Sequence, residues 1–458
     1  MQKPTTNRGE ASHDPTIETE RESELRQSNI LSHYRRNFLA FLGEASLFGV
    51  GLVFASTTIV LPDFVSHMTD SAVFVGLIVS LSEGAWRLPQ LFFANLLTNK
   101  RRKKPWLTRA GLAGRPAYLL YAIALGLGLS RLPTLGLALF FLLHCLFYIN
   151  LALDSVVWWD VFGKAIPIPK RGRLLGLSAA LRGILSVGAG YLIARLFAEN
   201  GPSFPFNYAV IFALSGFSLL LSLISWMFIV EPEEPVEEKR VLWRHYLPQL
   251  GDILRNNCAF RRLLIVRLLA GFDGLALGLY VLFGLKELGL SAATLGLFTA
   301  VQTVGGILAG LGFGVLSERV GNHRVIQVAT AISLTAPLVA LGFRLTGFAN
   351  GTMGSVIYAW IFLAIGVFLN ANFIGFSNYA VELAPTGQRG TYIGLFNTVS
   401  GMIVVWPAVG GWLLERTSYL VLFALTAGLL FVAFVSSLWL PRVRHLALTF
   451  EQGAPPRR

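Results

Sequence analysis

Long apolar runs recur along the chain, and short polar segments separate them. An α-helix rises about 1.5 Å per residue, so a run of about 20 apolar residues can cross the hydrocarbon core of a bilayer. We therefore predict twelve transmembrane helices, six on either side of the longest polar interruption. They cover residues 38–60, 73–97, 110–130, 132–153, 174–198, 206–229, 263–285, 292–316, 325–345, 353–377, 391–414 and 418–440.

Composition and charge agree with a membrane protein. Of the 458 residues, 54% are hydrophobic and 14% are charged, whereas soluble proteins carry about 25% charged residues. The net charge of +13 would suggest nucleic-acid binding in a soluble protein, but here most Lys and Arg residues gather in alternate loops. By the positive-inside rule, we expect a multi-pass protein of the cell membrane with both termini cytoplasmic. The opposite side holds only Arg131, Arg195, Lys286, Arg344 and Arg416.

The polar interruption divides the chain. It opens with an acidic run and continues with apolar residues at helical spacing, which predicts a cytoplasmic linker with an amphipathic helix on the membrane surface. The polar composition of the first 37 residues favours a disordered tail. The predicted parts are a cytoplasmic tail at 1–37, an N-terminal six-helix bundle at 38–230, the linker at 231–260, a C-terminal six-helix bundle at 261–441 and a cytoplasmic tail at 442–458.

The two halves repeat each other. Between the first two spans of each half, Ser71, Ala72, Gly76 and Leu77 recur as Ser291, Ala292, Gly296 and Leu297. Around the start of the fifth span of each half, six further identities occur at one offset, and they include a proline and an Arg-Gly pair. These six are Pro167, Arg171, Gly172, Gly176, Leu177 and Gly183, which recur as Pro385, Arg389, Gly390, Gly394, Leu395 and Gly401.

The loop after the eighth span, residues 314–324, reads Gly-Val-Leu-Ser-Glu-Arg-Val-Gly-Asn-His-Arg. It resembles the loop signature of the major facilitator superfamily. The twelve spans, the duplication and the linker add to this resemblance, which covers about residues 38–441. The resemblance implies an all-α fold of two pseudo-symmetric six-helix bundles around a central cavity, and secondary transport by alternating access.

In that family, contacts of this loop hold the cytoplasmic gate shut in one state. Two glycines permit unusual backbone angles, and Glu318 can sit at the positive end of a neighbouring helix. We therefore predict that Glu318 lies near Arg173 and Leu174 when the protein is closed to the cytoplasm; a tight loop with snorkelling charges is the alternative. The expected gate residues are Gly314, Glu318, Arg319, Gly321, Arg324, Asp160, Glu382, Arg171 and Arg389.

The equivalent loop of the first half, residues 94–104, departs from this pattern. Thr98 stands where an acid is expected, and both glycines are absent. The helix-end contact of the acid therefore cannot be transferred to this half. The basic run of this loop suits either Asp160 or anionic lipid head groups, and the sequence leaves both open.

Charged residues inside spans are costly and mark functional sites by default. Ser80, Glu83, Arg87 and Gln90 fall on one face of the second span, so we expect this face to meet the protein interior or a water-filled cavity. A Glu83–Arg87 pair that only holds helices together is an equally good interpretation.

Other charges stand more alone in the spans. A carboxyl group in a low-dielectric interior can exchange protons near neutral pH, as proton coupling requires, whereas a buried arginine suits an anionic substrate group or a carboxylate. Arg115 and Arg267 are near enough to the cytoplasm to snorkel, so we interpret both as anchors. We expect the substrate and coupling cavity to include Glu83, Arg87, Arg182, Asp273, Glu44, Asn150, Gln302, Asn370, Asn372 and Asn397.

The sequence contains no phosphate-binding loop, catalytic triad setting or zinc ligand set, and Cys145 and Cys258 lie too far apart in this topology to pair. We therefore expect no enzymatic activity, no cofactor and no metal site. The best interpretation is a monomeric secondary transporter in the lipid bilayer, with a small organic solute as substrate, H⁺ as the default coupling ion and no nucleic-acid partner. A transport-inactive membrane sensor and a lipid or amphiphile flippase of the same fold are the alternatives.

The distribution of Lys and Arg generates a first prediction. A cysteine placed in the 231–260 linker should react with a membrane-impermeant thiol reagent only after the cells are opened, because the linker is cytoplasmic. A cysteine placed in a loop on the opposite side should react in intact cells. Labelling of the linker from outside intact cells would overturn the topology.

Overall fold

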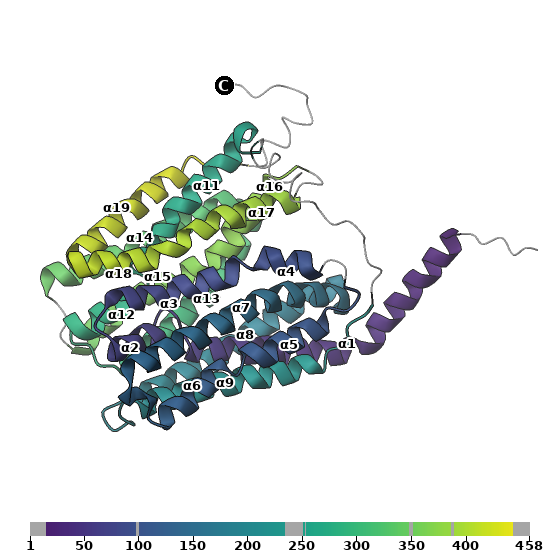
Figure 1. Cartoon of the computed structure of the whole chain (residues 1–458). Coiled ribbons are helices and arrows are strands. Elements are labelled where there is room, and N and C mark those ends of the chain that lie inside the picture. Colours follow the sequence, from purple (N-terminus) through teal and green to yellow (C-terminus); the bar gives the residue numbers. More distant parts are fainter. Residues whose placement is uncertain are drawn as a thin grey trace, which may run out of the picture.

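The protein folds into two helical halves that lie side by side (Figure 1). The computed structural model describes residues 15–97, 100–233, 251, 253–347, 351–385 and 389–442. Over these ranges the secondary structure is helical, without a strand. The N-terminal half comprises α1 to α9, and the C-terminal half comprises α11 to α19.

The N-terminal half contains long helices and short helical segments. They are α1 (Pro15–Phe54), α2 (Val60–Met68), α3 (Ala72–Arg87), α4 (Gln90–Leu97), α5 (Lys104–Gly114), α6 (Ala117–Gly126), η1 (Leu129–Arg131), α7 (Pro133–Ala165), α8 (Ile168–Leu196) and α9 (Phe206–Met227).

The C-terminal half has more interrupted helices. They are α11 (Cys258–Ala270), η2 (Gly271–Ala276), α12 (Leu279–Leu282), η3 (Phe283–Glu287), α13 (Thr294–Arg319), α14 (Asn322–Thr346), α15 (Gly351–Ala371), η4 (Asn372–Ser377), α16 (Asn378–Glu382), α17 (Arg389–Ser400), η5 (Gly401–Val405), α18 (Trp406–Arg416) and α19 (Tyr419–Ser437).

The predicted twelve-helix fold is confirmed. In the described residues, 11 continuous helical stretches are long and apolar enough to cross a membrane. The remaining span, predicted at 110–130, corresponds to α5 and α6, which meet at Arg115-Pro116. Neither piece reaches the length of a span by itself, because the helix is interrupted where proline cannot donate a backbone hydrogen bond.

Two expectations about polar segments have different outcomes. The disordered tail is wrong for residues 15–37, because α1 begins at Pro15 and continues without a break into the first span (Figure 1). This stretch is rich in Glu and Arg, which are good helix formers. The amphipathic helix of the linker falls mostly on residues 234–250, which lie outside the described residues, so it stays a prediction.

Glycines bring the two halves into close contact at one end of the molecule, which we call the paired end; it holds the turn between α2 and α3. A Cβ atom on Gly76 of α3 would lie 2.0 Å from the carbonyl oxygen of Pro407 on α18, and one on Gly411 would lie 2.2 Å from the carbonyl oxygen of Ala72. Only residues without a side chain allow helix backbones to approach this closely.

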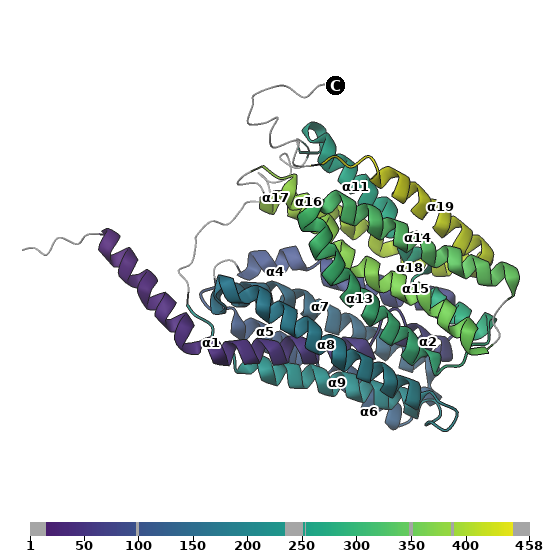
Figure 2. The same cartoon turned by 180° about the vertical axis from the view of Figure 1, so that it is seen from behind.

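The second contact between the halves joins α8 and α13, which Figure 2 shows side by side. A Cβ atom on Gly296 would lie 2.3 Å from the carbonyl oxygen of Gly190. Further along the pair, Gly183 lies against Ile307. Gly76 and Gly296 are equivalent in the internal repeat, so each half contributes the same glycine to an equivalent contact.

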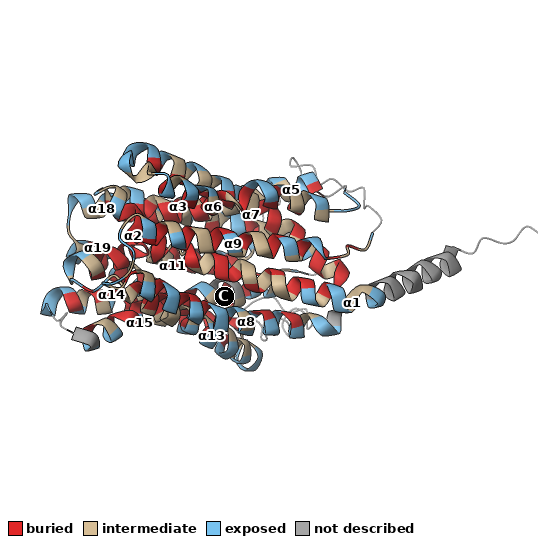
Figure 3. Cartoon of the chain, turned by 90° about the horizontal axis from the view of Figure 1, so that it is seen from below, coloured by how far each residue is buried: buried red, intermediate tan, exposed pale blue. Residues whose placement is uncertain are grey.

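The halves separate toward the opposite end, which we call the splayed end; it holds the starts of α5, α8 and α11. Added Cβ atoms on Gly172 and Gly176 of α8 would meet nothing within 4 Å, and the same holds for Gly312 and Gly314 of α13. The α8–α13 contact therefore stops about midway along both helices. Buried residues lie along the helix faces inside each half, while many residues facing outward are exposed (Figure 3).

A carboxylate also links the two halves at the paired end. Glu415 of α18 accepts hydrogen bonds from the Ser71 hydroxyl at 2.5 Å and from the Val73 backbone amide at 3.2 Å. It thus satisfies free amide groups at the amino end of α3, where the helix dipole favours negative charge.

We predict that Glu415→Ala shifts the protein toward a state in which the paired end is open, because the link to α3 is lost. Spin labels at Asp70→Cys and Thr417→Cys, in a protein with Cys145 and Cys258 replaced by Ser, should report a larger population of long distances. Glu199→Ala removes another exposed carboxylate, one that has no hydrogen bond among the described residues, and is the matched control. An unchanged distance distribution in Glu415→Ala would contradict the role of this link.

Candidate functional site

Four charged side chains gather between the two halves. Glu83 and Arg87 lie on α3, Arg267 lies on α11 and Asp273 follows on η2. The Arg87 Nε atom donates to a Glu83 carboxylate oxygen at 2.5 Å. The charges of Glu83 and Arg87 act on both Arg267 and Asp273 across the interface. The formal charges of this group, which we call the interface cluster, sum to zero.

The polar face of α3 meets the C-terminal half. The Ser80 hydroxyl accepts a hydrogen bond from the backbone amide of Ala408 on α18 at 3.1 Å. Glu83 and Arg87 follow one and two turns further along the same face and remain partly exposed, at 37% and 22% of their side-chain surface. The Ser80 contact agrees with the expectation that this face meets the protein interior.

The interpretation of Arg267 as a snorkelling anchor is wrong. Its exposed fraction is 3%, its Nη1 atom is buried without a hydrogen-bond partner among the described residues, and its guanidinium lies 5.4 Å from the centre of the Phe376 ring. The predicted span began at residue 263, which placed Arg267 about one turn inside. The helix begins at Cys258, so Arg267 lies more than two turns from its start, beyond the reach of the surface.

Arg182, also predicted for the cavity, lies on α8 against α1. An added Cβ atom on Gly49 would lie 2.0 Å from the Arg182 Cδ atom, so the arginine occupies the space that this glycine leaves. The side chain is exposed and makes no hydrogen bond or ion pair with the described residues. Within this part of the chain, no contact joins it to the interface cluster.

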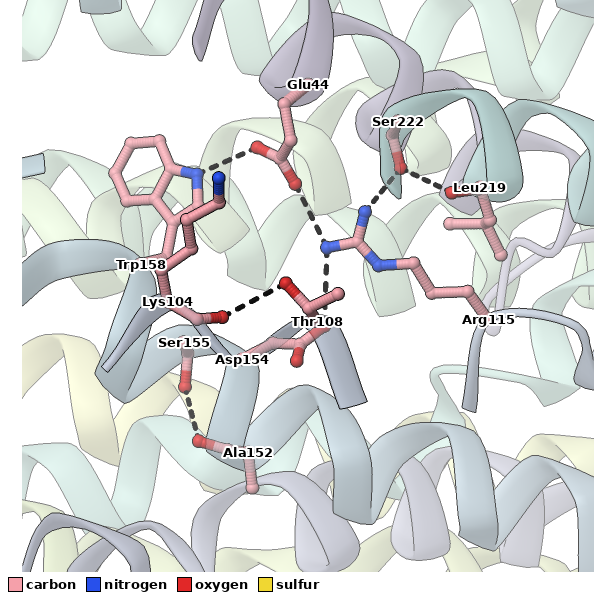
Figure 4. Close-up of polar contacts among 10 residues, drawn as sticks. All are labelled: Glu44, Lys104, Thr108, Arg115, Ala152, Asp154, Ser155, Trp158, Leu219 and Ser222. Carbon is pink, nitrogen blue, oxygen red and sulfur yellow. Dashed lines mark hydrogen bonds and ion pairs between the residues drawn. The ribbon is translucent and has the colours of Figure 1, made fainter. Parts of the chain in front are cut away.

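A second group of charges is buried inside the N-terminal half (Figure 4). Arg115, at the end of α5, donates from Nη2 to Glu44 of α1 at 3.1 Å and to Asp154 of α7 at 3.3 Å. Its Nη1 atom donates to the Ser222 hydroxyl on α9 at 2.6 Å. The other oxygen of Glu44 accepts from the Trp158 indole at 2.8 Å. We call this group the arginine network; it joins four helices.

The arginine network corrects the interpretation of Arg115 as an anchor, because its exposed fraction is 2%. It also contains Asp154, which sequence reasoning placed outside the fourth span. That span was predicted to end at residue 153, but α7 continues to Ala165. The apolar and aromatic residues that follow Asp154 were the available signal. Glu44 therefore has partners inside its own bundle rather than in the interface cluster.

The remaining polar candidates are dispersed. Gln302 accepts a hydrogen bond from the Thr58 hydroxyl at 3.0 Å, which joins the halves near the paired end. Asn150 and Asn370 donate to carbonyl oxygens one turn earlier on their own helices. Asn397 is exposed, and the side chain of Asn372 lies outside what the structure describes. Of the residues predicted for the substrate and coupling cavity, the structure therefore brings only some together in the interface cluster.

The predicted gate loop of the C-terminal half is a tight turn. Gly321 has φ of +110°, a conformation that favours glycine, as expected. Asn322 accepts from Ser317 at 2.7 Å and donates to Glu382 at 2.7 Å, which ties the loop to α16. Arg324 donates to Gln327. Gly314 borders open space, Arg319 is exposed, and the side chain of Arg389 is not described.

Glu318 is exposed and makes no hydrogen bond or ion pair with the described residues. The contact expected with Arg173 and Leu174 belongs to a state in which this end is closed, whereas here α8 and α13 separate toward the splayed end. The contact stays a prediction.

The equivalent loop of the first half is held by different charges. Lys103 binds Asp160 at 2.6 Å, and Lys164 binds the same carboxylate at 2.5 Å. Glu231 accepts from the backbone amides of Lys103 and Lys104 at 2.8 Å each, at the amino end of α5. Of the two partners proposed for the basic run, Asp160 is therefore bound by Lys103. A further gate candidate, Arg171, donates to the carbonyl oxygens of Ile166 and Gly163.

One histidine and both cysteines lie outside the interface cluster and the arginine network. His144 bonds to Ser82 at 2.8 Å and to Tyr118 at 3.0 Å, inside the N-terminal half, which agrees with a structural histidine. Both cysteines are free. Within the described residues, no three His, Cys, Asp or Glu side chains are grouped to hold a metal ion.

Comparisons with known proteins agree with this architecture. The model of the family described as Major Facilitator Superfamily matches residues 115–405, more than half of the chain. No curated protein matches the sequence.

Solved structures of similar fold include a mutant of the nucleoside transporter NupG, with 14% identity, a TM-score of 0.64, and coverage of 89% of this chain and 99% of that one. A D-xylose–proton symporter has 15% identity and a TM-score of 0.63, over 90% and 98% of the chains. A bacterial homologue of the iron transporter ferroportin, in an inward-facing state, has 17% identity and a TM-score of 0.61, over 89% and 99%. At these identities the likeness concerns the fold.

The arginine network generates a prediction about stability. Arg115→Gln leaves two carboxylates buried without a cation, and breaking a buried ion pair costs about 3–5 kcal/mol. Glu44→Gln should cost less, because Asp154 remains to neutralise the arginine. We expect the melting temperature in detergent to fall strongly in Arg115→Gln and only weakly in Glu44→Gln. Arg109→Gln, which removes an exposed arginine, is the control; equal effects of all three substitutions would contradict this account.

Proposed function

The chain belongs to the Major Facilitator Superfamily, and we propose that it moves a small organic solute across the cell membrane by alternating access, with H⁺ as the coupling ion. The observation that carries this proposal is the contact between the halves. They pack through glycines at the paired end, separate toward the splayed end, and have charged groups from both halves between them. A rocking motion of one half against the other would exchange which end is packed.

The similar structures support a solute transporter without fixing its substrate. They carry the names of a nucleoside transporter, a xylose–proton symporter and a homologue of an iron transporter. A family of transporters argues against an enzyme. We propose H⁺ as the coupling ion because carboxylates from both halves lie in or near the membrane interior, where a proton is the simplest ion for them to exchange.

We further propose that the splayed end faces the cytoplasm, with both termini on that side. The loops rich in Lys and Arg, such as 100–104 and 169–173, are at this end. The structure would then represent an inward-facing state, as in the ferroportin homologue. We propose a monomer, since one chain already forms both halves around the interface cluster.

A proteoliposome assay with an inward proton gradient distinguishes a transporter from a sensor of the same fold. A thermal-shift screen of the purified protein first selects solutes that bind, since ligands of the folded state raise its melting temperature. Uptake of a selected solute that responds to the gradient is expected. Binding without uptake in either direction would favour the sensor.

Proton coupling generates two opposed predictions for the interface cluster. If Asp273 takes up the coupling proton, Asp273→Asn should abolish gradient-driven uptake while solute exchange persists. If Glu83 is the site instead, Glu83→Gln should have this effect and Asp273→Asn should not. Driven uptake and exchange are measured side by side for both variants. Normal gradient-driven uptake in both would end the proposal that either carboxylate couples protons.

A further inference from the structure

Arg267 is a buried cation without an internal partner. Its exposed fraction is 3%, and it makes no hydrogen bond or ion pair with the residues that the structure describes. Among those residues, the face of the Phe376 ring is its close electrostatic contact, 5.4 Å from the guanidinium. Arg115, the buried arginine of the other half, differs because its guanidinium has partners. It donates to two carboxylates and a hydroxyl.

An unpaired buried guanidinium is costly. Arginine does not lose its proton in proteins, so it cannot become neutral when it is buried. A buried charge without hydrogen bonds destabilises the fold, and a cation–π contact compensates only part of this cost. Arg267 therefore has hydrogen-bond donors that are free to bind a group able to accept them.

The position of Arg267 is at the contact between the halves. Glu83 and Arg87 of the other half act on its charge. One turn further along the same chain segment, Gly271 contacts Ile403 of η5, which itself packs against α3. A molecule bound at Arg267 would therefore meet both halves, which is the location that alternating access requires of a transported solute.

The nearby acids do not satisfy Arg267 in this structure. Glu83 is engaged by Arg87 at 2.5 Å. Asp273 lies near enough for its charge to act on Arg267, but the two side chains form no ion pair. The interface cluster thus has a cation whose hydrogen-bonding capacity is unused by the described residues.

We propose that Arg267 binds an anionic group of the transported solute, a carboxylate or a phosphate, and that the substrate class is therefore small organic anions. This inference rests on the proposed transport function. The planar guanidinium presents paired N–H donors that match the two oxygens of a carboxylate or phosphate, which favours Arg over Lys at such a site.

The rival explanation is internal: Arg267 pairs with Asp273 after the halves rearrange. The two explanations differ in the double variant Arg267→Gln/Asp273→Asn, which removes both charges. If the arginine only neutralises Asp273, the double variant regains the ligand response that Arg267→Gln lost. If the arginine binds the ligand, the response stays lost.

The test uses matched neutral and anionic solutes on the purified full chain. The pairs are uridine with uridine 5′-monophosphate, glucose with glucuronate, and glycerol with glycerol 3-phosphate; inorganic phosphate and acetate test the anionic group alone. We expect an anionic member to raise the melting temperature while its neutral partner does not. In Arg267→Gln the apparent affinity should fall about 10- to 100-fold, as expected when charge-assisted hydrogen bonds are lost. Arg344→Gln, an exposed arginine of the same half, should keep the response.

The outcomes separate this inference from the proposed function. It is overturned if no anion stabilises the wild-type protein, if neutral and anionic partners act equally, if Arg267→Gln keeps the response, or if the double variant regains it. The first two results come from the wild-type protein, so they can overturn the inference even if Arg267→Gln does not fold. Proteoliposome uptake of a neutral solute, unaffected by Arg267→Gln, would preserve transport as the function while it removes the anionic substrate class.

Discussion

Close backbone contact at the paired end is the constraint on which the arrangement of the two halves depends. Gly76 and Gly411 bring α3 against α18, and Gly190 and Gly296 bring α8 against α13. In a membrane, apolar side chains gain little by leaving lipid for another helix, so close packing of small residues has to hold the helices together. The same contacts decide which residues further along these helices can meet across the interface.

Because α3 and α18 converge at this end, the polar face of α3 is turned toward the C-terminal half. Ser80 reaches the α18 backbone, and Glu83 and Arg87 then lie within electrostatic reach of Asp273 and Arg267. The polar residues of α3 lie one to three turns beyond Gly76. The close packing at this glycine therefore brings the charges of α3 near those of the C-terminal half. A rearrangement of the halves would necessarily change the surroundings of all four charges.

The buried arginines of the two halves differ in their hydrogen-bond partners, although the halves repeat each other in sequence. Arg115 is surrounded by acceptors from three other helices, which makes the arginine network a fixed link within one bundle. Arg267 lies beside an aromatic ring and has no acceptor among the described residues. The loops differ as well. Ion pairs and amide contacts of Lys103, Asp160 and Glu231 hold the first copy, whereas the neutral side chain of Asn322, bonded to Ser317 and to the Glu382 carboxylate, holds the second. The pseudo-symmetric fold thus carries an asymmetric distribution of charge.

The sequence by itself determined the number and approximate position of the spans, the duplication and the family resemblance, because the thickness of a bilayer fixes the length of an apolar helix. It also identified Glu83, Arg87 and Asp273, since charges in apolar runs are conspicuous. It misjudged Arg115, Arg267 and Asp154, whose depth depends on where helices begin and end; polar or aromatic residues at the ends of α7 and α11 concealed these limits. Only the tertiary structure decided which charges are partners, because that depends on the rotation and contact of helices far apart in the chain.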